Sequence, residues 1–285
     1  MTLALRLPAP AKLNLFLHVT GRRDDGYHLL ESVFVPITLA DTVTLTLRAD
    51  GLIRLLNPPE GLNETNELAC RAARALQIAS GTHLGVDIHL VKRIPQGAGL
   101  GGGSSDAATA LLGLNRLWKL NRSRGQLQDI GATLGADVPF FVFGQPALVQ
   151  GIGEKLRAVT MPTTYAVVAS PCVSVATHAV FTHADLTRNT PPLQMPVFAL
   201  GFGANDLQPI ATLLAPEIDR LQRTFVNAGA TPKMTGSGSC VFALAHRAGE
   251  ALQLQAALTQ AGWRAWAVKT LARHPLYSLA VSATI

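Results

Sequence analysis

Alternating apolar and polar residues mark several strands along the chain. Within residues 11–19, three leucines and a valine alternate with Lys12, Asn14, Phe16 and His18, and this period of two is typical of a β-strand. Further strands are predicted at Asp41–Leu47, Val86–Leu90, Tyr165–Ala169 and Val241–Ala245. Lys12 and Asn14 lie one ladder step apart on the same strand face, so both can reach into a cleft; a solvated strand face is the alternative.

Apolar residues at helical spacing predict six helices. They lie at Asn66–Ser80, Ser105–Lys119, Gln126–Leu134, His178–Phe181, Pro209–Ala228 and Gly249–Gly262. Glycine and proline punctuate Gly51–Asn63 and Thr187–Pro196, which are predicted to be loops. The glycine and proline content rises again at Gly144–Pro162, which indicates a domain boundary. We therefore expect two domains, residues 1–155 and residues 156–285.

The stretch Pro95–Asp106 joins a predicted strand to a predicted helix and contains five glycines and two adjacent serines. Glycine adopts positive φ and has no Cβ, so successive N–H groups can converge on one point. The first turn of the following helix adds its unsatisfied N–H groups and the positive end of its dipole. This stretch therefore predicts a site for a polyphosphate.

Two better-known phosphate motifs do not account for this stretch. A P-loop has a lysine after its glycines, and none follows here. Gly97, Gly99 and Gly102 satisfy the spacing of the dinucleotide fingerprint, but no βαβ series with a ribose-binding acid accompanies them. A flexible connection is the remaining alternative, although ordinary turns need only one or two glycines.

Composition narrows the class of protein. The chain has 285 residues, of which 48% are hydrophobic and 15% charged, so it can bury a large core. Its net charge of +6 is scattered, with Arg22-Arg23 as the densest basic cluster; this favours an anionic small molecule over nucleic acid. Three widely spaced cysteines without metal-ligand spacing, and no apolar run long enough for a membrane span or a signal peptide, predict a reduced cytoplasmic protein.

Two further segments carry candidate chemistry. Tyr27 and His28 follow a glycine turn, where an aromatic ring and an imidazole can stack on and hydrogen-bond a planar base. Asp137 lies between small residues and Pro139. Its carboxylate can accept a proton from a substrate hydroxyl if it lies near the phosphates, and a helix cap or turn aspartate is the alternative.

Three of these segments together resemble the motifs of the GHMP kinase superfamily. They are Pro10–Leu15, Pro95–Ser105 and Thr235–Cys240, the middle one being the superfamily's phosphate loop. Ala11–Leu17, Gly26–His28, Leu134–Phe140 and Val149–Glu154 are similar to the branch that phosphorylates a cytidine diphosphate-linked methylerythritol in the non-mevalonate isoprenoid pathway. The resemblance covers nearly the whole chain and implies an α+β fold of two domains with the active-site cleft between them.

The resemblance also implies residue roles. It implies that ATP, with Mg²⁺, phosphorylates the 2-hydroxyl of the acceptor, with Asp137 as general base and Lys12 holding the hydroxyl and the carboxylate in register. The implied ATP-binding residues are Pro95, Gly97, Ala98, Gly99, Leu100, Gly101, Gly102, Gly103, Ser104 and Ser105. The implied substrate-binding residues are Asn14, Tyr27, His28, Asn66, Thr177 and Phe181.

Several points stay open at this stage. Ser104 or Ser105 can contribute to Mg²⁺, but the sequence shows no separate set of acidic ligands. The expected partner is a small molecule linked to cytidine diphosphate, with no nucleic acid and no membrane, in a monomer or a homodimer. The alternatives are a homoserine or mevalonate kinase, against which Gly26–His28 argues, a sensor that has lost turnover, and a nucleic-acid-binding protein.

Overall fold

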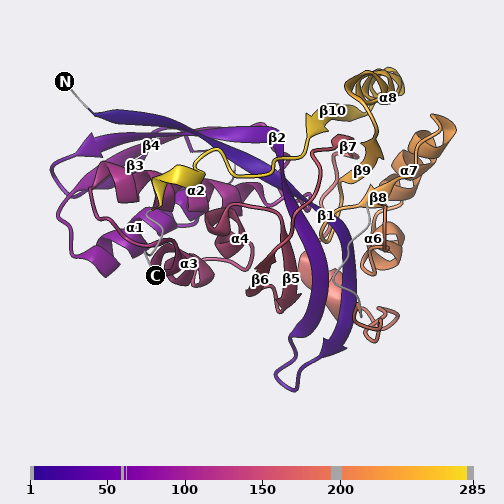
Figure 1. Cartoon of the computed structure of the whole chain (residues 1–285), viewed down its shortest axis with the longest axis horizontal. Coiled ribbons are helices and arrows are strands. Elements are labelled where there is room, and N and C mark those ends of the chain that lie inside the picture. The colour runs from indigo at the N-terminus through magenta and orange to yellow at the C-terminus, as the bar shows by residue number, and fades with distance from the viewer. Residues whose placement is uncertain (1–2, 59–60, 62, 194–200, 281–285) are drawn as a thin grey trace.

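A long antiparallel hairpin runs through the whole molecule (Figure 1). The computed structural model describes residues 3–58, 61, 63–193 and 201–280. The hairpin pairs β1 (Ala4–Arg22) with β2 (His28–Arg48), and the expected glycine turn joins them. Both strands extend well beyond the strands predicted from the sequence at 11–19 and Asp41–Leu47. Residues 9–19 of β1 are buried on both faces, so Lys12 and Asn14 do not lie on a solvated face.

The first sheet is built on β2. Residues 42–48 of β2 pair with β4 (Gly85–Val91), and residues 30–34 of β2 pair with β5 (Ala147–Gly151). β1 pairs along the other edge of β2. Two short strands, β3 (Ile53–Leu55) and β6 (Lys155–Ala158), complete the six-stranded sheet. One face is covered by α1 (Leu68–Ser80), α2 (Gly102–Leu117), α3 (Arg124–Ala132) and α4 (Val138–Phe143) (Figure 1).

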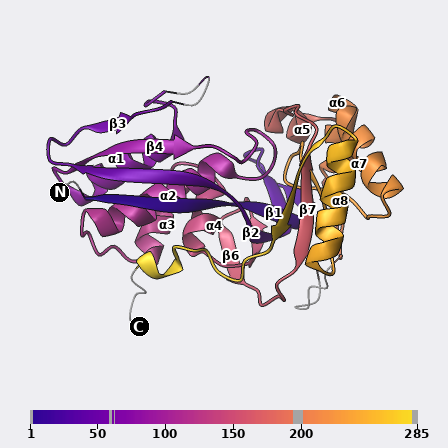
Figure 2. The ribbon, with the colours of Figure 1, turned by 90° about the horizontal axis from the view of Figure 1, so that it is seen from above.

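The second half forms a four-stranded sheet in the order β10-β7-β9-β8. Its strands are β7 (Tyr165–Ser170), β8 (Lys233–Met234), β9 (Val241–Ala245) and β10 (Arg264–Lys269). The accompanying helices are α5 (Thr177–Thr182), α6 (Gln208–Leu214), α7 (Glu217–Asn227) and α8 (Ala248–Gln260). Figure 2 shows these elements gathered at one end of the long hairpin, with α1 and α3 at the other.

The core has three parts, and β1 takes part in each of them. Leu7 packs under the first sheet with α2, whereas Leu17 packs with the helices of the second half. Between the two sheets, Leu13 meets Val168 and Phe242 in a third cluster. Because apolar side chains close-pack there, the two halves are held in one fixed arrangement.

The end of the chain returns to the first half. Leu271 N–H donates to Pro36 O at 2.8 Å, and His274 N–H donates to Gly144 O at 2.7 Å. Beyond these bonds a 3-10 helix, η1 (Tyr277–Leu279), lies against the first core, in which Leu276 and Ala280 are buried. We call residues 270–280 the C-terminal strap. It ties the last strand of the second half to α4.

The structure corrects three elements of the sequence prediction. The predicted loop Gly51–Asn63 contains β3, which pairs parallel to β4. The single helix predicted at Pro209–Ala228 is two helices, α6 and α7, because Pro216 cannot continue the first. A helix, α4, follows Asp137 where none was predicted. Residues 194–196 of the predicted loop Thr187–Pro196 lie outside the described residues.

The boundary expected at residue 155 stays a prediction. β6 begins at Lys155 and pairs with β5, so the first sheet extends to Ala158. Within the described residues, none of the helices is long and apolar enough to cross a membrane. Cys70, Cys172 and Cys240 are free, and two of them are buried.

Candidate active site

The glycine-rich stretch forms a loop between β4 and α2, as the sequence predicts. Gly97, Gly99 and Gly101 all have positive φ, between 60° and 77°. This is the left-handed region, which side chains with a Cβ rarely adopt. At Gly99 an added Cβ would stand 2.1 Å from Thr235 O, so the loop packs directly against the backbone of the second half. We call residues 95–105 the glycine loop.

The carbonyl groups of the glycine loop face the rest of the protein. Ala98 O accepts from Cys240 N–H at 3.2 Å and Leu100 O accepts from Lys12 N–H at 3.0 Å, while Gly99 O accepts from the Thr235 hydroxyl at 3.4 Å. In a trans peptide the C=O and N–H groups point in opposite directions. The N–H groups of residues 99–101 therefore point away from these partners.

These N–H groups lie beside the start of α2. The helix begins at Gly102 with Gly101 as its N-cap, and its first turn contains no acidic side chain. The unpaired N–H groups of that turn and the positive end of the dipole are therefore available to an anion. A cavity of about 320 Å³ opens here, lined by residues 95–99 and 101–104 of the glycine loop and by Asn66, Glu67, Leu68, Lys92 and Ile94.

Lys12 and Asp137 meet beside the glycine loop. Lys12 Nζ lies 3.5 Å from Asp137 Oδ2, and the two side chains are 4% and 30% exposed. Asp137 directly precedes α4, yet its side chain makes no capping hydrogen bond to that helix. Its carboxylate is therefore free of the capping hydrogen bond that was the alternative expectation, and it can accept a proton from a substrate hydroxyl.

Several groups hold Lys12 in place. Its ammonium donates to Asn14 Oδ1 at 2.6 Å and lies 4.4 Å above the Phe34 ring. Asn14 in turn donates from Nδ2 to Ser32 Oγ, and its backbone N–H donates to Thr235 Oγ1, both at 3.0 Å. Because β1, β2 and the Thr235–Cys240 loop all contribute, Lys12 is fixed by both halves of the chain.

Tyr27, His28 and Phe181 lie together at the turn end of the hairpin. The rings of His28 and Phe181 are 5.0 Å apart, and Tyr27 is 61% exposed. His28 shares a strand face with Ser32 and Phe34. Phe34 lies six positions after His28 on β2, or about 20 Å along the strand. Because Lys12 lies over the Phe34 ring, an elongated molecule is needed to contact both His28 and Lys12.

Thr177 and Asn66 occupy other places. Thr177 Oγ1 lies 2.8 Å from Ser237 Oγ, which joins the start of α5 to the Thr235–Cys240 loop. Asn66 lines the cavity beside the glycine loop, whereas Phe181 lies in α5 at the opposite end of the molecule from α1 (Figure 2). The role of Asn66 as a substrate contact stays a prediction; Asn66 lies on the glycine-loop side of the site.

A buried ionic cluster that was not predicted from the sequence lies behind the glycine loop. Lys92 Nζ pairs with both Asp41 and Asp106, and Asp41 also accepts the N–H groups of Arg93 and Ile94, which precede the loop. Burial raises the pKa of Asp106, and Lys92 only partly offsets this. Burial also disfavours the Lys92 ammonium, but the two carboxylates outweigh it, so its pKa is raised. The signal available in the sequence was Asp41 and Lys92, each a charged residue next to an apolar strand.

Replacing Lys92 by Met is expected to destabilise the protein strongly. The side chains of Asp41 and Asp106 are at most 1% exposed, and removing their shared partner leaves two buried carboxylates facing each other. We expect the free energy of unfolding to fall by about 3 to 5 kcal/mol, measured by urea denaturation. Arg223→Met, which breaks a surface pair with Asp219, should lower it by less than about 1 kcal/mol. Equal losses would show that the buried cluster contributes no special stability.

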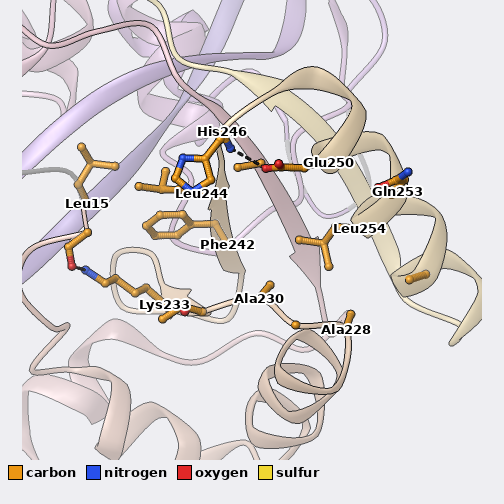
Figure 3. A pocket seen from close by; sticks show the side chains of 15 residues that line it. Leu15, Ala228, Ala230, Lys233, Phe242, Leu244, His246, Glu250, Gln253 and Leu254 are labelled. Atoms are coloured by element: carbon orange, nitrogen blue, oxygen red, sulfur yellow. Dashed lines mark hydrogen bonds between the residues drawn. The ribbon is translucent and has the colours of Figure 1, made fainter.

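A second cavity, of about 540 Å³, lies in the other half between α7, α8 and β9 (Figure 3). Its floor is apolar, with Phe242, Leu244 and Leu254. Its charged groups are already engaged: Lys233 Nζ donates to Gly201 O and Phe202 O, and Glu250 accepts from His246 N–H. Among the described residues that line this cavity, no ion pair joins an acid to a base as Lys12 and Asp137 are joined.

Comparison with known proteins agrees with this geometry. Residues 67–145 match the family described as GHMP kinases N terminal domain, and residues 197–264 match GHMP kinases C terminal. The 4-diphosphocytidyl-2-C-methyl-D-erythritol kinase of Azoarcus sp. (strain BH72) is 50% identical over 95% of this chain and 96% of its own length. The chain belongs to the 4-diphosphocytidyl-2-C-methyl-D-erythritol kinase family of GHMP kinases.

Other relatives agree with this family assignment. The enzyme of the same name from Thiobacillus denitrificans is also 50% identical, over 95% of this chain and 96% of its own. A crystal structure of 4-(cytidine 5'-diphospho)-2C-methyl-D-erythritol kinase superposes with a TM-score of 0.81 at 38% identity, covering 93% of this chain and 99% of that one. A homoserine kinase from Cytophaga hutchinsonii, at 18% identity and a TM-score of 0.70 over 95% of this chain and 96% of its own, shares the fold alone.

The comparisons also confirm the two-domain GHMP kinase fold expected from the sequence. The chain is therefore a small-molecule kinase of the α+β class. Arg188, Ser32, Asp41 and Lys92 were not among the expected functional residues, and the structure places all four around the groups that were.

Proposed function

We propose that this kinase transfers the γ-phosphoryl group of ATP to the 2-hydroxyl of 4-diphosphocytidyl-2-C-methyl-D-erythritol. The products are the 2-phosphate and ADP, in the non-mevalonate route to isoprenoid precursors. The observation that carries the proposal is the Lys12–Asp137 pair beside the glycine loop. Lys12 covers the ring of Phe34, and His28 lies on the same face of β2 as Phe34, about 20 Å along the strand. Relatives of this name that are 46–50% identical over nearly the whole chain support the acceptor.

In this mechanism the glycine loop binds the ATP phosphates through backbone N–H groups. Positioning and charge stabilisation are the main demands that phosphoryl transfer makes on a protein, and the loop supplies both without a P-loop lysine. Asp137 accepts the proton of the acceptor hydroxyl as its oxygen attacks the γ-phosphorus, and ADP leaves. Lys12 holds the hydroxyl and carboxylate in register and offsets the negative charge that develops.

Mg²⁺ fits this site only as an ion held largely by the nucleotide. Within the described residues, no group of three or more His, Cys, Asp or Glu side chains can hold a metal. Ser105 donates its hydroxyl to Pro10 O at 2.7 Å and is fully buried, and Glu67, which lines the cavity, caps α1. Ser104 in the cavity lining and Asp137 beside the glycine loop are the side chains that would face the ion. Such a sparse set suits Mg²⁺, which keeps several waters and binds through one or two carboxylates and substrate phosphates. When bound, the ion would neutralise phosphate charge.

The opposite end of the acceptor would lie at the turn end of the hairpin. Tyr27 and Phe181 offer aromatic faces for a base, and His28, whose ring contacts that of Phe181, offers a hydrogen-bonding group. Thr177 lies between this region and the Thr235–Cys240 loop. We therefore infer that the net charge of +6 serves two polyphosphate ligands and not a nucleic acid. Cytoplasmic location and a monomeric or homodimeric state stay predictions.

The proposal predicts acceptor specificity. With Mg-ATP, ADP release should be rapid with the diphosphocytidyl methylerythritol acceptor and near background with homoserine, with mevalonate or without acceptor. A coupled ADP-release assay measures this. Turnover with mevalonate or homoserine instead would overturn the acceptor, and ATP binding without turnover on any acceptor would favour a sensor that has kept the kinase fold.

A further inference from the structure

Arg124 joins three segments that lie far apart in the sequence. It is the first residue of α3, where a capping box fixes the start of the helix. Its guanidinium donates to Val142 O and Phe143 O at the end of α4 and to Tyr277 O in the C-terminal strap. It also lies 4.2 Å from the centre of the Tyr277 ring, where the strap returns to the first half beside α3 (Figure 2). Arg124 therefore clamps the end of α4 to the strap.

The junction between α4 and the strap is tightly packed. Gly144 is the C-cap of α4, and its carbonyl accepts from His274 N–H at 2.7 Å. An added Cβ at Gly144 would stand 3.1 Å from the Tyr277 ring and 3.3 Å from Arg124 Nη1. The last carbonyl groups of a helix have no partner within that helix, and at α4 the partners come from Arg124 and the strap. The end of α4 is thereby held in one position.

The short helix α4 touches each part of the candidate site. Asp137 directly precedes it. The Phe140 ring packs edge-on against Phe34 with 5.2 Å between centres, and Lys12 lies over that same Phe34 ring. Phe141 lies against the glycine loop, because an added Cβ at the N-cap glycine of α2 would stand 3.0 Å from its ring. A helix of six residues is not stable alone in water, so the position of α4 depends on what holds its ends.

We propose that Arg124 is a positioning residue for phosphoryl transfer. By clamping the end of α4 to the C-terminal strap, it holds the whole helix, and with it Asp137, in register with Lys12. The importance of that register rests on the proposed function, in which Asp137 is the base. With a rise of about 1.5 Å per residue, the clamp lies about 9 Å along the helix from Asp137. Arg124 therefore acts through α4 and not on the reacting atoms.

The first test reads the clamp without any substrate. Amide hydrogen exchange, followed by mass spectrometry, should be faster at residues 138–144 in Arg124→Met than in the wild-type protein, with α1 unchanged. Arg124→Lys should give an intermediate rate, because an ammonium keeps the charge but lacks the planar fork that spans α4 and the strap. Arg273→Met is the matched control. Arg273 also lies over the Tyr277 ring, at 5.0 Å, and its removal should leave residues 138–144 at the wild-type rate. Wild-type exchange in both Arg124 variants would overturn the proposal.

The second test reads the reaction in the ADP-release assay. Arg124→Met should lower kcat by about 10 to 10²-fold, because a displacement of about 1 Å is enough for such a loss. The KM for ATP should stay nearly unchanged, since the Thr235–Cys240 loop holds the glycine loop separately. Arg124→Lys should show a smaller loss of kcat and keeps the test open if the Met variant does not fold. A wild-type kcat in the Arg124 variants would contradict the proposal.

A double mutant distinguishes positioning from a general loss of folded protein. In the Asp137→Asn background, Arg124→Met should lower kcat by less than about twofold, because the group that it positions is already absent. If the two losses multiply in full, Arg124 acts on stability alone and the proposal is wrong. Normal turnover by Asp137→Asn would instead count against the proposed function, while faster exchange at residues 138–144 would still support the clamp on α4.

Discussion

Asp137→Asn should reduce kcat by about 10² to 10⁴-fold while leaving the KM values for both substrates nearly unchanged. Asparagine preserves the size of the side chain, and its amide oxygen can still face Lys12 at the position where the carboxylate lies 3.5 Å away. It cannot accept the proton of the acceptor hydroxyl. An effect on kcat without an effect on KM is the signature of a group that acts in the transition state.

Steady-state ADP release with each substrate varied in turn measures both constants. Asp219→Asn is the control, because Asp219 lies on α7 in a surface pair with Arg223, and it should behave as the wild-type protein. Normal turnover by Asp137→Asn would remove Asp137 as the base. A rise in KM with unchanged kcat would instead assign it to binding.

Gly99→Ala should be the most damaging substitution of the glycine loop. Its φ of 77° disfavours any Cβ, and the new Cβ would stand 2.1 Å from Thr235 O, a backbone atom that cannot rotate away. We expect the free energy of unfolding to fall by at least about 4 kcal/mol and the KM for ATP to rise, because the loop must leave the Thr235–Cys240 segment.

Gly81→Ala separates the two causes. Gly81 ends α1 with a φ of 67°, and nothing lies within 4 Å of an added Cβ. This substitution should carry only the backbone penalty of about 1 to 2 kcal/mol and should leave the KM for ATP unchanged. Urea denaturation and ATP kinetics of the two variants test the comparison. Equal losses of stability would mean that contact with the second half does not constrain the glycine loop.

Local patterns in the sequence predicted the elements that bury one face. Alternation located β4, and helical spacing located α1 and α8. The part of β2 at Glu31–Ile37 was not predicted as a strand, because it is buried on both faces and therefore shows no alternation. Glu31 is tolerated there because Gln150 and Leu193 donate to its carboxylate at 2.8 Å and 2.7 Å, and these partners lie far along the chain.

In the site, too, contiguous features could be predicted from the sequence and contacts between distant residues could not. The glycine loop is contiguous, so its composition alone indicated an anion site. The pairing of Lys12 with Asp137 required the resemblance, because the sequence by itself favoured a cap or turn aspartate. Arg188 was beyond sequence reasoning. It lies in a stretch predicted only as a loop, and its hydrogen bond to His28 joins it to a residue 160 positions earlier in the chain.

The C-terminal strap has a consequence for how the protein is made. Leu276 and Ala280 of the strap belong to the first core, and Leu17 of β1 packs with side chains of the second half. During synthesis, the first core cannot finish packing until residues 276–280 have left the ribosome, so the first half cannot complete its fold before the second half has been made, unlike the usual domain-by-domain course of larger chains. Newly made chains therefore expose unfinished apolar surface until the C-terminal strap has been made, and unfolding should be one cooperative event for both halves.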